Sequence, residues 1–156
     1  MNRTSRAAFS LVEVTLALGV AAIALIAIFG LLVTGTQTNH TAVEQTASSD
    51  ILTAVAADLR ATPKTSPTST QFGIAIPADG NTAATATLYF NSLSEASTSL
   101  DANSRYQLTI KFLPNGGGTG ARMATFVHLR MTWPAAANPA NVNTSSAETF
   151  VALDRH

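Results

Sequence analysis

An uncharged apolar run near the N-terminus constrains this chain more than any other feature. Residues 14–33 read VTLALGVAAIALIAIFGLLV, twenty positions without a charged side chain. As a helix, the run is about 30 Å long, which is roughly the thickness of the hydrocarbon core of a bilayer. Because it is apolar on every side, it lacks the polar face that a helix of a soluble protein turns to water. The run therefore predicts a membrane-spanning helix.

The charges before the run predict its orientation. Arg3 and Arg6 precede it, and residues 1–8 contain no acid. Basic residues are retained on the cytoplasmic side of a membrane. We therefore expect a single-pass membrane protein with a cytoplasmic N-terminus, and everything after Thr34 outside the cytoplasm.

One acid, Glu13, stands directly in front of the run, and three interpretations of the segment treat it differently. A cleaved secretory signal has an apolar core of about 7–15 residues and a small-x-small cleavage site, which the longer run and the following VTGTQ fit poorly. A plain anchor fits the length but assigns no role to Glu13. An acid in a membrane span costs about 3 kcal/mol at the membrane centre and less near an interface, so a role for it is expected. In the third interpretation, cleavage before Phe9 creates an α-amine, which can pair with the Glu13 carboxylate of a neighbouring chain.

The stretch AFSLVEV, which begins at Ala8, resembles the processing motif of type IV pilins and type II secretion pseudopilins. In that family a short basic leader precedes a small residue, usually Gly, then Phe, then Glu four residues after the Phe, then a long apolar segment. Phe9 and Glu13 match in type and spacing, Arg3 and Arg6 match the leader, and Ala8 departs from the usual Gly. More narrowly, the N-terminal segment, a late TWP and a terminal VALDR are similar to the pilin-like proteins called the Verru_Chthon cassette group.

The resemblance implies a processing and assembly pathway. Prepilin peptidase would cut between Ala8 and Phe9, the Phe9 amine would be methylated, and Phe9 and Glu13 would serve assembly. The implied partners are other pilin-like subunits, prepilin peptidase and the inner membrane. The implied function is that of a minor pseudopilin or minor pilin in a type II secretion or type IV pilus-like filament. A membrane-tethered periplasmic binding module or enzyme, which uses the helix only as an anchor, remains the alternative.

Residues 36–62 predict an amphipathic continuation of the helix. Its apolar stripe consists of Val43, Ala47, Ile51, Val55 and Leu59. Charged residues are expected off the stripe, namely Glu44, Asp50, Asp58 and Arg60. Pro63 disfavours helix in the residue before it, so the helix should end there.

Two glycines lie between the apolar and amphipathic halves. Gly30 and Gly35 weaken a helix by roughly 1 kcal/mol each relative to Ala, without ending it. We therefore expect one helix from about Phe9 to Ala61. The alternative is two helices with a flexible joint at residues 34–39.

The remainder of the chain, after Pro63, predicts a β domain. Strands are expected at residues 71–76, 84–91, 105–113, 121–133 and 148–154. The alternation in the third and fourth predicts an antiparallel hairpin, with Phe126, His128 and Arg130 on the outer side of the fourth. Residues 92–104 are expected to form a loop or a short helix.

The expected fold class is α+β, a long N-terminal helix packed on a small antiparallel sheet, which is also the pilin-like layout that the resemblance implies. The expected division is a removed leader (1–8), a transmembrane half-helix (9–35), an amphipathic half-helix (36–62) and a β domain (63–156).

The sequence contains no evident catalytic constellation. It has no cysteine, and His40, His128 and His156 lack metal-ligand spacing, so we expect no enzyme activity, metal site or cofactor. We interpret His128 as a surface residue and Trp133 as a core anchor. The formal net charge is zero, so no nucleic-acid partner is predicted.

Overall fold

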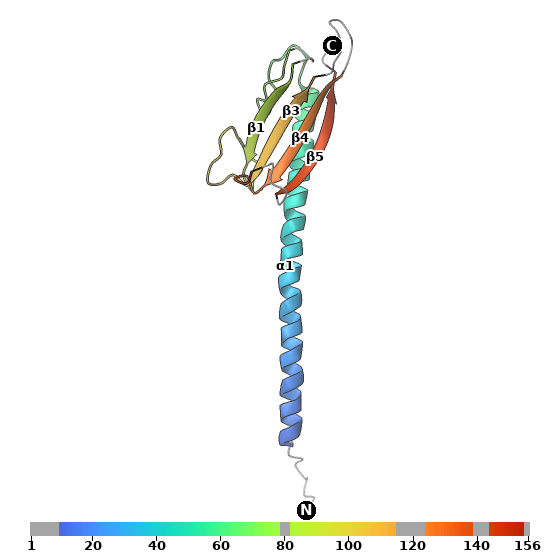
Figure 1. Cartoon of the computed structure of the whole chain (residues 1–156), viewed down its shortest axis with the longest axis vertical. Helices are drawn as coiled ribbons and strands as arrows, with labels where there is room; N and C mark the ends of the chain where they lie inside the picture. The colour runs from blue at the N-terminus through green and yellow to red at the C-terminus, as the bar shows by residue number, and fades with distance from the viewer. Residues whose placement is uncertain (1–9, 79–81, 115–123, 139–143, 155–156) are drawn as a thin grey trace, which may run out of the picture. The chain divides into compact units, whose positions relative to one another are not determined.

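A computed structural model of the chain describes residues 10–78, 82–114, 124–138 and 144–154. The elements of this part of the chain are α1 (Leu11–Ala61), β1 (Ala84–Phe90), β2 (Ala96–Ser97), β3 (Tyr106–Leu113), β4 (Thr125–Trp133) and β5 (Ser145–Leu153). Figure 1 labels all of them except the two-residue strand β2. The chain divides into two compact units, Met1–Val43 and Glu44–His156, and each is described by itself.

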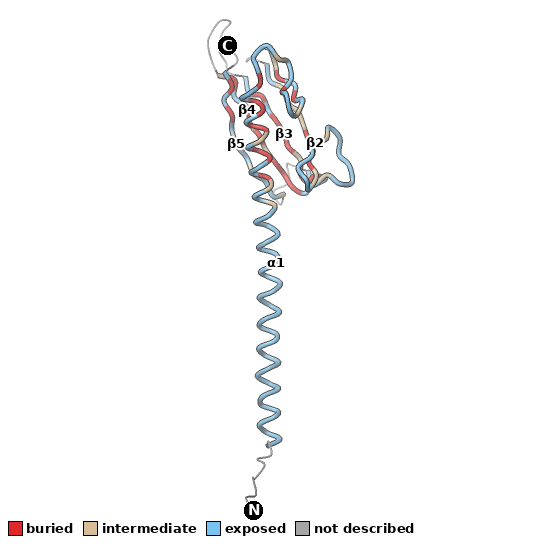
Figure 2. The backbone as a smooth tube through the Cα atoms, turned by 180° about the vertical axis from the view of Figure 1, so that it is seen from behind, coloured by how far each residue is buried: buried red, intermediate tan, exposed pale blue. Residues whose placement is uncertain are grey.

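The first unit contains the N-terminal part of α1. This helix runs without a break through Gly30 and Gly35, so the prediction of one helix is confirmed and the alternative of a joint is wrong. Figure 2 shows the helix in this unit as exposed, and every described residue up to Val43 is exposed.

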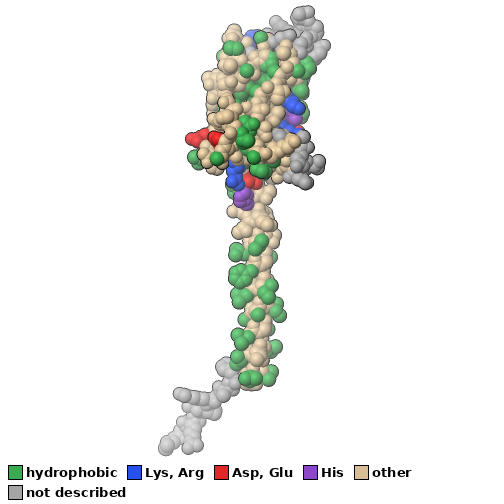
Figure 3. All heavy atoms as spheres, turned by 60° about the vertical axis from the view of Figure 1, so that its left-hand side comes forward, with side chains coloured by type: hydrophobic (Ala, Val, Ile, Leu, Met, Phe, Trp, Pro, Cys, Tyr) green, Lys and Arg blue, Asp and Glu red, His purple; other side chains and the backbone are tan. Residues whose placement is uncertain are grey.

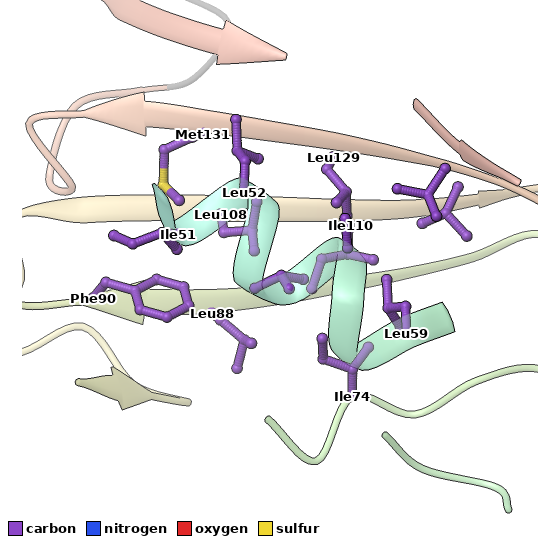
Figure 4. Close-up of a cluster of buried hydrophobic side chains, with 14 of the residues drawn as sticks. Ile51, Leu52, Leu59, Ile74, Leu88, Phe90, Leu108, Ile110, Leu129 and Met131 are labelled. Atoms are coloured by element: carbon purple, nitrogen blue, oxygen red, sulfur yellow. The ribbon is translucent and has the colours of Figure 1, made fainter. Parts of the chain in front are cut away.

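The second unit is a single antiparallel sheet covered on one face by the last turns of α1. The strand order is β2-β1-β3-β4-β5. Side chains of α1 such as Ile51, Leu52 and Leu59 pack against Leu108, Ile110 and the other inward residues of the sheet (Figure 4). The predicted α+β fold, a long helix on a small antiparallel sheet, is thus confirmed.

The predicted stripe of α1 is correct in its second half and wrong at its start. Ile51, Val55 and Leu59 are buried, whereas Val43 is 59% exposed. A row spaced by four residues rotates about 40° around the helix at each step, because a turn takes 3.6 residues. Val43 therefore lies about 160° around the helix from Leu59. Asp58, expected off the stripe, is buried instead.

Four of the five predicted strands are present as β1, β3, β4 and β5. The hairpin of β3 and β4 is confirmed, with Ile110 opposite Leu129. The β5 strand begins at Ser145 rather than residue 148, since Ser145 and Ser146 continue the pairing with β4.

The strand predicted at residues 71–76 is wrong. This segment forms only an isolated bridge, between Thr68 and Ala75, and Gly73 has a φ of 62°, outside the β region. Ile74 and Ile76 are buried as part of a loop that covers the core. The segment predicted as loop or short helix, residues 92–104, is a loop that contains β2.

Candidate functional site

The predicted assembly residue Glu13 lies in the first turn of α1. The carbonyl oxygen of Ser10 accepts hydrogen bonds from the backbone N–H groups of Glu13 and Val14, at 3.0 and 3.2 Å. Ser10 therefore occupies the N-cap position, and Glu13 is the third helical residue. Ala8 and Phe9, the predicted processing site, lie outside the described residues.

A local role for Glu13 was missed in the sequence analysis. Ser10 and Glu13 have the Ser-x-x-Glu spacing of a capping box, in which each side chain can satisfy a free backbone N–H of the first turn. In the described structure, however, neither side chain makes a hydrogen bond or an ion pair. An acid at this position also interacts favourably with the positive end of the helix dipole. Any test of Glu13 must therefore separate helix capping from assembly.

The segment behind Glu13 presents apolar side chains in all directions. Every large apolar side chain from Leu11 to Val33 is exposed, and the lowest exposed fraction is 47%, at Val14. Figure 3 shows these side chains along α1. By length and composition, α1 is a candidate membrane span. Water is an unfavourable surrounding for such a surface, which would be covered by lipid or by other helices.

Hydroxyl side chains follow the apolar segment, and their bonds stay within the helix. Thr34 donates to the carbonyl oxygen of Gly30 at 3.2 Å, and Thr38 donates to that of Thr34 at 3.0 Å. Thr41 donates to the carbonyl oxygen of Gln37 at 3.1 Å. These hydroxyls are therefore satisfied without water or a partner chain, so they do not oppose burial of this part of α1.

A hollow of about 530 Å³ lies beside the start of β3 in the second unit, with Glu44, Ser92, Asn103, Arg105, Trp133 and Ser145 among its lining residues. Its strongest charges are already paired, because Nη2 of Arg105 lies 2.8 Å from Oε1 of Glu44. Trp133 is buried and packs edge-on against Tyr106 with ring centroids 6.2 Å apart, so it is the predicted core anchor. The part of the chain that the structure describes contains no group of three or more His, Asp or Glu residues able to hold a metal ion.

His128 lies on the outer side of β4, as predicted, but it is not a freely solvated residue. Its side chain is 20% exposed, and its Nε2 lies 3.0 Å from Oε2 of Glu148. Its ring stacks on that of Phe150 with centroids 4.6 Å apart. The sequence analysis missed this cluster, which depends on the pairing of β4 with β5.

No protein-family model, curated protein or solved structure matches this chain. The features that distinguish the described part of this chain are Glu13 and the exposed apolar residues behind it.

Proposed function

We propose that this chain is a pilin-like subunit, a minor pseudopilin or minor pilin, that inserts in the inner membrane and assembles through α1 into a type II secretion or type IV pilus-like filament. The observation that carries the proposal is the Glu13 carboxylate, which is exposed at the front of an apolar helix and makes no ion pair with a described residue. A carboxylate in apolar surroundings is costly unless a cation pairs with it. The α-amine of Phe9 on a neighbouring chain would be that cation.

Processing would create this amine. A cut by prepilin peptidase between Ala8 and Phe9 precedes the apolar segment, so the mature protein would keep its membrane anchor. The basic leader with Arg3 and Arg6 supports this proposal and favours a cytoplasmic N-terminus. The second unit would then be periplasmic or extracellular.

The pairing would supply the specific part of the assembly energy. Lipid tails are as apolar as Leu and Ile side chains, so burial alone does not bring helices together in a membrane. Ala17 and Ala21 lie one turn apart on the same face of α1 and permit close approach of a second helix. An ion pair shielded from water between such helices would be worth more than a surface ion pair, which contributes about 0–1 kcal/mol.

The alternative function is a membrane-tethered binding module or enzyme. The hollow beside Trp133 favours it, because a volume of about 530 Å³ lies in the range of small-molecule sites. Against it, Arg105 in this hollow is already paired with Glu44. A mature protein that is strictly monomeric and binds a small molecule tightly would support the alternative.

The test compares Glu13→Gln with Glu13→Ala in the full chain in membranes. Gln at this position keeps the residue spacing of a capping box and removes the charge, whereas Ala removes both. We expect both variants to insert and to be cut before Phe9, since the leader and the apolar segment are unchanged. We also expect both to lose copurification with partner subunits by about tenfold or more, equivalent to about 1.4 kcal/mol.

The matched control is Asp50→Asn, which neutralises an exposed acid elsewhere on α1 and should copurify like the parent. If the Glu13→Gln form copurifies as well as the parent, charge pairing does not recruit this subunit, and the tethered module becomes the better proposal.

A further inference from the structure

The exposed large apolar side chains of the second unit fall into two groups. Among the described residues from Glu44 onward they are Leu93 (76% exposed), Leu100 (50%), Leu113 (37%), Phe126 (48%) and Phe150 (62%). The first group consists of Leu93 and Leu100, which lie in the connection between β1 and β3. The other three residues lie on β3, β4 and β5. Isolated exposed apolar residues are ordinary, but grouped ones mark interaction surfaces.

The second group forms what we call the aromatic face, on the outer side of the sheet. Lys111, His128 and Phe150 are cross-strand neighbours in one row, and Leu113 and Phe126 are neighbours in the next row. The stacking of Phe150 on His128 holds the aromatic ring in place on this surface.

The aromatic face carries charges of both signs, among which Lys111 lies between its aromatic residues. Arg130 adds a second positive charge and Glu148 a negative one, and the acid Asp154 follows the end of β5. Glu148 lies 3.0 Å from Nε of Arg130, an ion pair without an aligned hydrogen bond. Lys111 makes no ion pair within the described structure, so its charge is available to a partner.

The first group belongs to what we call the acidic loop, residues 91–104. Glu95 and Asp101 are its only charged residues, so its balance is −2. Figure 3 shows acidic side chains at the left of this unit, and basic and histidine side chains both at its right and at its lower end.

Local hydrogen bonds give the acidic loop a defined conformation. Oδ1 of Asn91 accepts from the backbone N–H groups of Leu93 and Glu95 at 2.9 and 3.0 Å. Oδ1 of Asp101 accepts from the N–H of Asn103 at 2.9 Å. A preformed loop loses little conformational freedom when it binds, which favours its use as a contact surface.

We infer that the acidic loop of one copy of this chain binds the aromatic face of a second copy. Leu93 and Leu100 would cover Phe126 and Phe150, and the two carboxylates would lie near Lys111. This inference deepens the proposed function and rests on it. The two surfaces lie at different places on the unit, so each copy would use its loop toward one neighbour and its face toward the next, which extends a filament rather than closing a dimer.

Contacts between two identical surfaces fit less well. Loop against loop would oppose two balances of −2. Pairing of two β5 edges about a two-fold axis would point residues 44–61 of the two copies in opposite directions. Chains anchored in one membrane by the same end share one direction, so this edge-to-edge pairing conflicts with a common anchor.

Disulfide cross-linking tests the contact, because the chain has no cysteine of its own. One full-length chain carries Ser92→Cys and a second, with a different tag, carries Ala152→Cys. The two chains are expressed together in membranes and oxidised. Both substitutions leave the apolar and charged contact residues in place. We expect a mixed disulfide between the two chains and little disulfide from either chain alone. The matched control pairs Ala152→Cys with Thr70→Cys, another exposed position, and should give no product.

Charge reversal then tests the complementarity. Lys111→Glu in the Ala152→Cys chain should lower the yield of mixed disulfide by about tenfold, because like charges would then oppose each other. Glu95→Lys in the Ser92→Cys chain should restore the yield, whereas Arg60→Glu, an exposed control on α1, should leave it unchanged. An equal yield with Lys111→Glu, or predominant 92–92 or 152–152 products, would overturn the inference.

The failure of this contact is distinguishable from failure of the proposed function. If partner subunits copurify in a Glu13-dependent manner while the mixed disulfide is absent, only this inference is wrong. If Glu13-dependent copurification is also absent, the proposed function fails. Aromatic side chains beside cations can also bind single-stranded nucleic acid. The full chain can therefore be tested with a labelled oligothymidylate. If it binds this probe, Lys111→Glu abolishes the binding and no mixed disulfide forms, the inference is overturned in favour of a nucleic-acid partner.

Discussion

Oδ1 of Asp58 accepts a hydrogen bond at 2.9 Å from the backbone N–H of Gln71, thirteen residues further along the chain. Oδ2 of the same carboxylate accepts from the N–H of Phe72 at 3.1 Å. The last turn of α1 is thereby joined to the loop that places Ile74 and Ile76 in the core. The carboxylate of Asp58 therefore helps to hold this loop against the hydrophobic core.

Replacing Asp58 with Ala should destabilise the second unit. Two partly buried N–H groups would lose a charged acceptor, at a cost of about 2–3 kcal/mol in the free energy of unfolding. Asp58→Asn keeps one oxygen acceptor and should cost about half as much. Urea denaturation followed by circular dichroism measures both values. Asp50→Ala, at an exposed position on the same helix, should change the stability by less than about 0.5 kcal/mol, and an equal loss there would exclude this explanation.

The packing of α1 on the sheet predicts a sharp contrast between two apolar positions of the predicted stripe. Ile51 is 3% exposed, so Ile51→Asp would bury an unpaired charge and cost several kcal/mol. Val43 is 59% exposed, so Val43→Asp should leave the stability nearly unchanged. Thermal melting of the two variants measures the contrast. If Ile51→Asp melts like the parent, α1 is not packed as described.

Local periodicity explains which parts of the fold could be predicted from the sequence. The alternation in β3 and β4 and the apolar spacing of α1 after Ala47 are properties of short windows, and these elements were found. The burial of Ile74 was not predictable in this way, because its loop is held by hydrogen bonds to Asp58, in the last turn of α1. β2 pairs through only two residues, which leave no periodic signal.

The candidate site was predictable to a similar extent. Glu13 stands out in the sequence because it is the one acid in front of a long apolar run. Its capping spacing with Ser10 was equally visible. The aromatic face was not predictable, because Phe126, His128 and Phe150 come together only through the register of β4 with β5.

A fragment that begins at Thr36 should be soluble and folded. The buried hydrophobic core consists of residues from Ile51 onward, so removal of residues 1–35 takes away none of it. The removed segment contains the candidate membrane span, whose exposed side chains favour aggregation in water. A cooperative thermal transition and a sedimentation profile without large aggregates would agree with this expectation. An unfolded fragment would show that the N-terminal part of α1 is needed for folding.

The processing site makes the last prediction. The mature chain should begin at Phe9, and intact-mass measurement should show the loss of residues 1–8 and the gain of one methyl group.

Ala8→Gly should be cut at least as fast as the parent, because Gly is the usual residue of the motif that this segment resembles. Ala8→Leu should block the cut, because a branched side chain would occupy a position that the motif keeps small. The uncut chain would stay in the membrane with its basic leader still attached. Ser5→Ala, also in the leader, serves as the control and should be processed normally. A mature N-terminus near Gly35 would identify a secretory signal instead, since the apolar segment would then be lost and Glu13 with it.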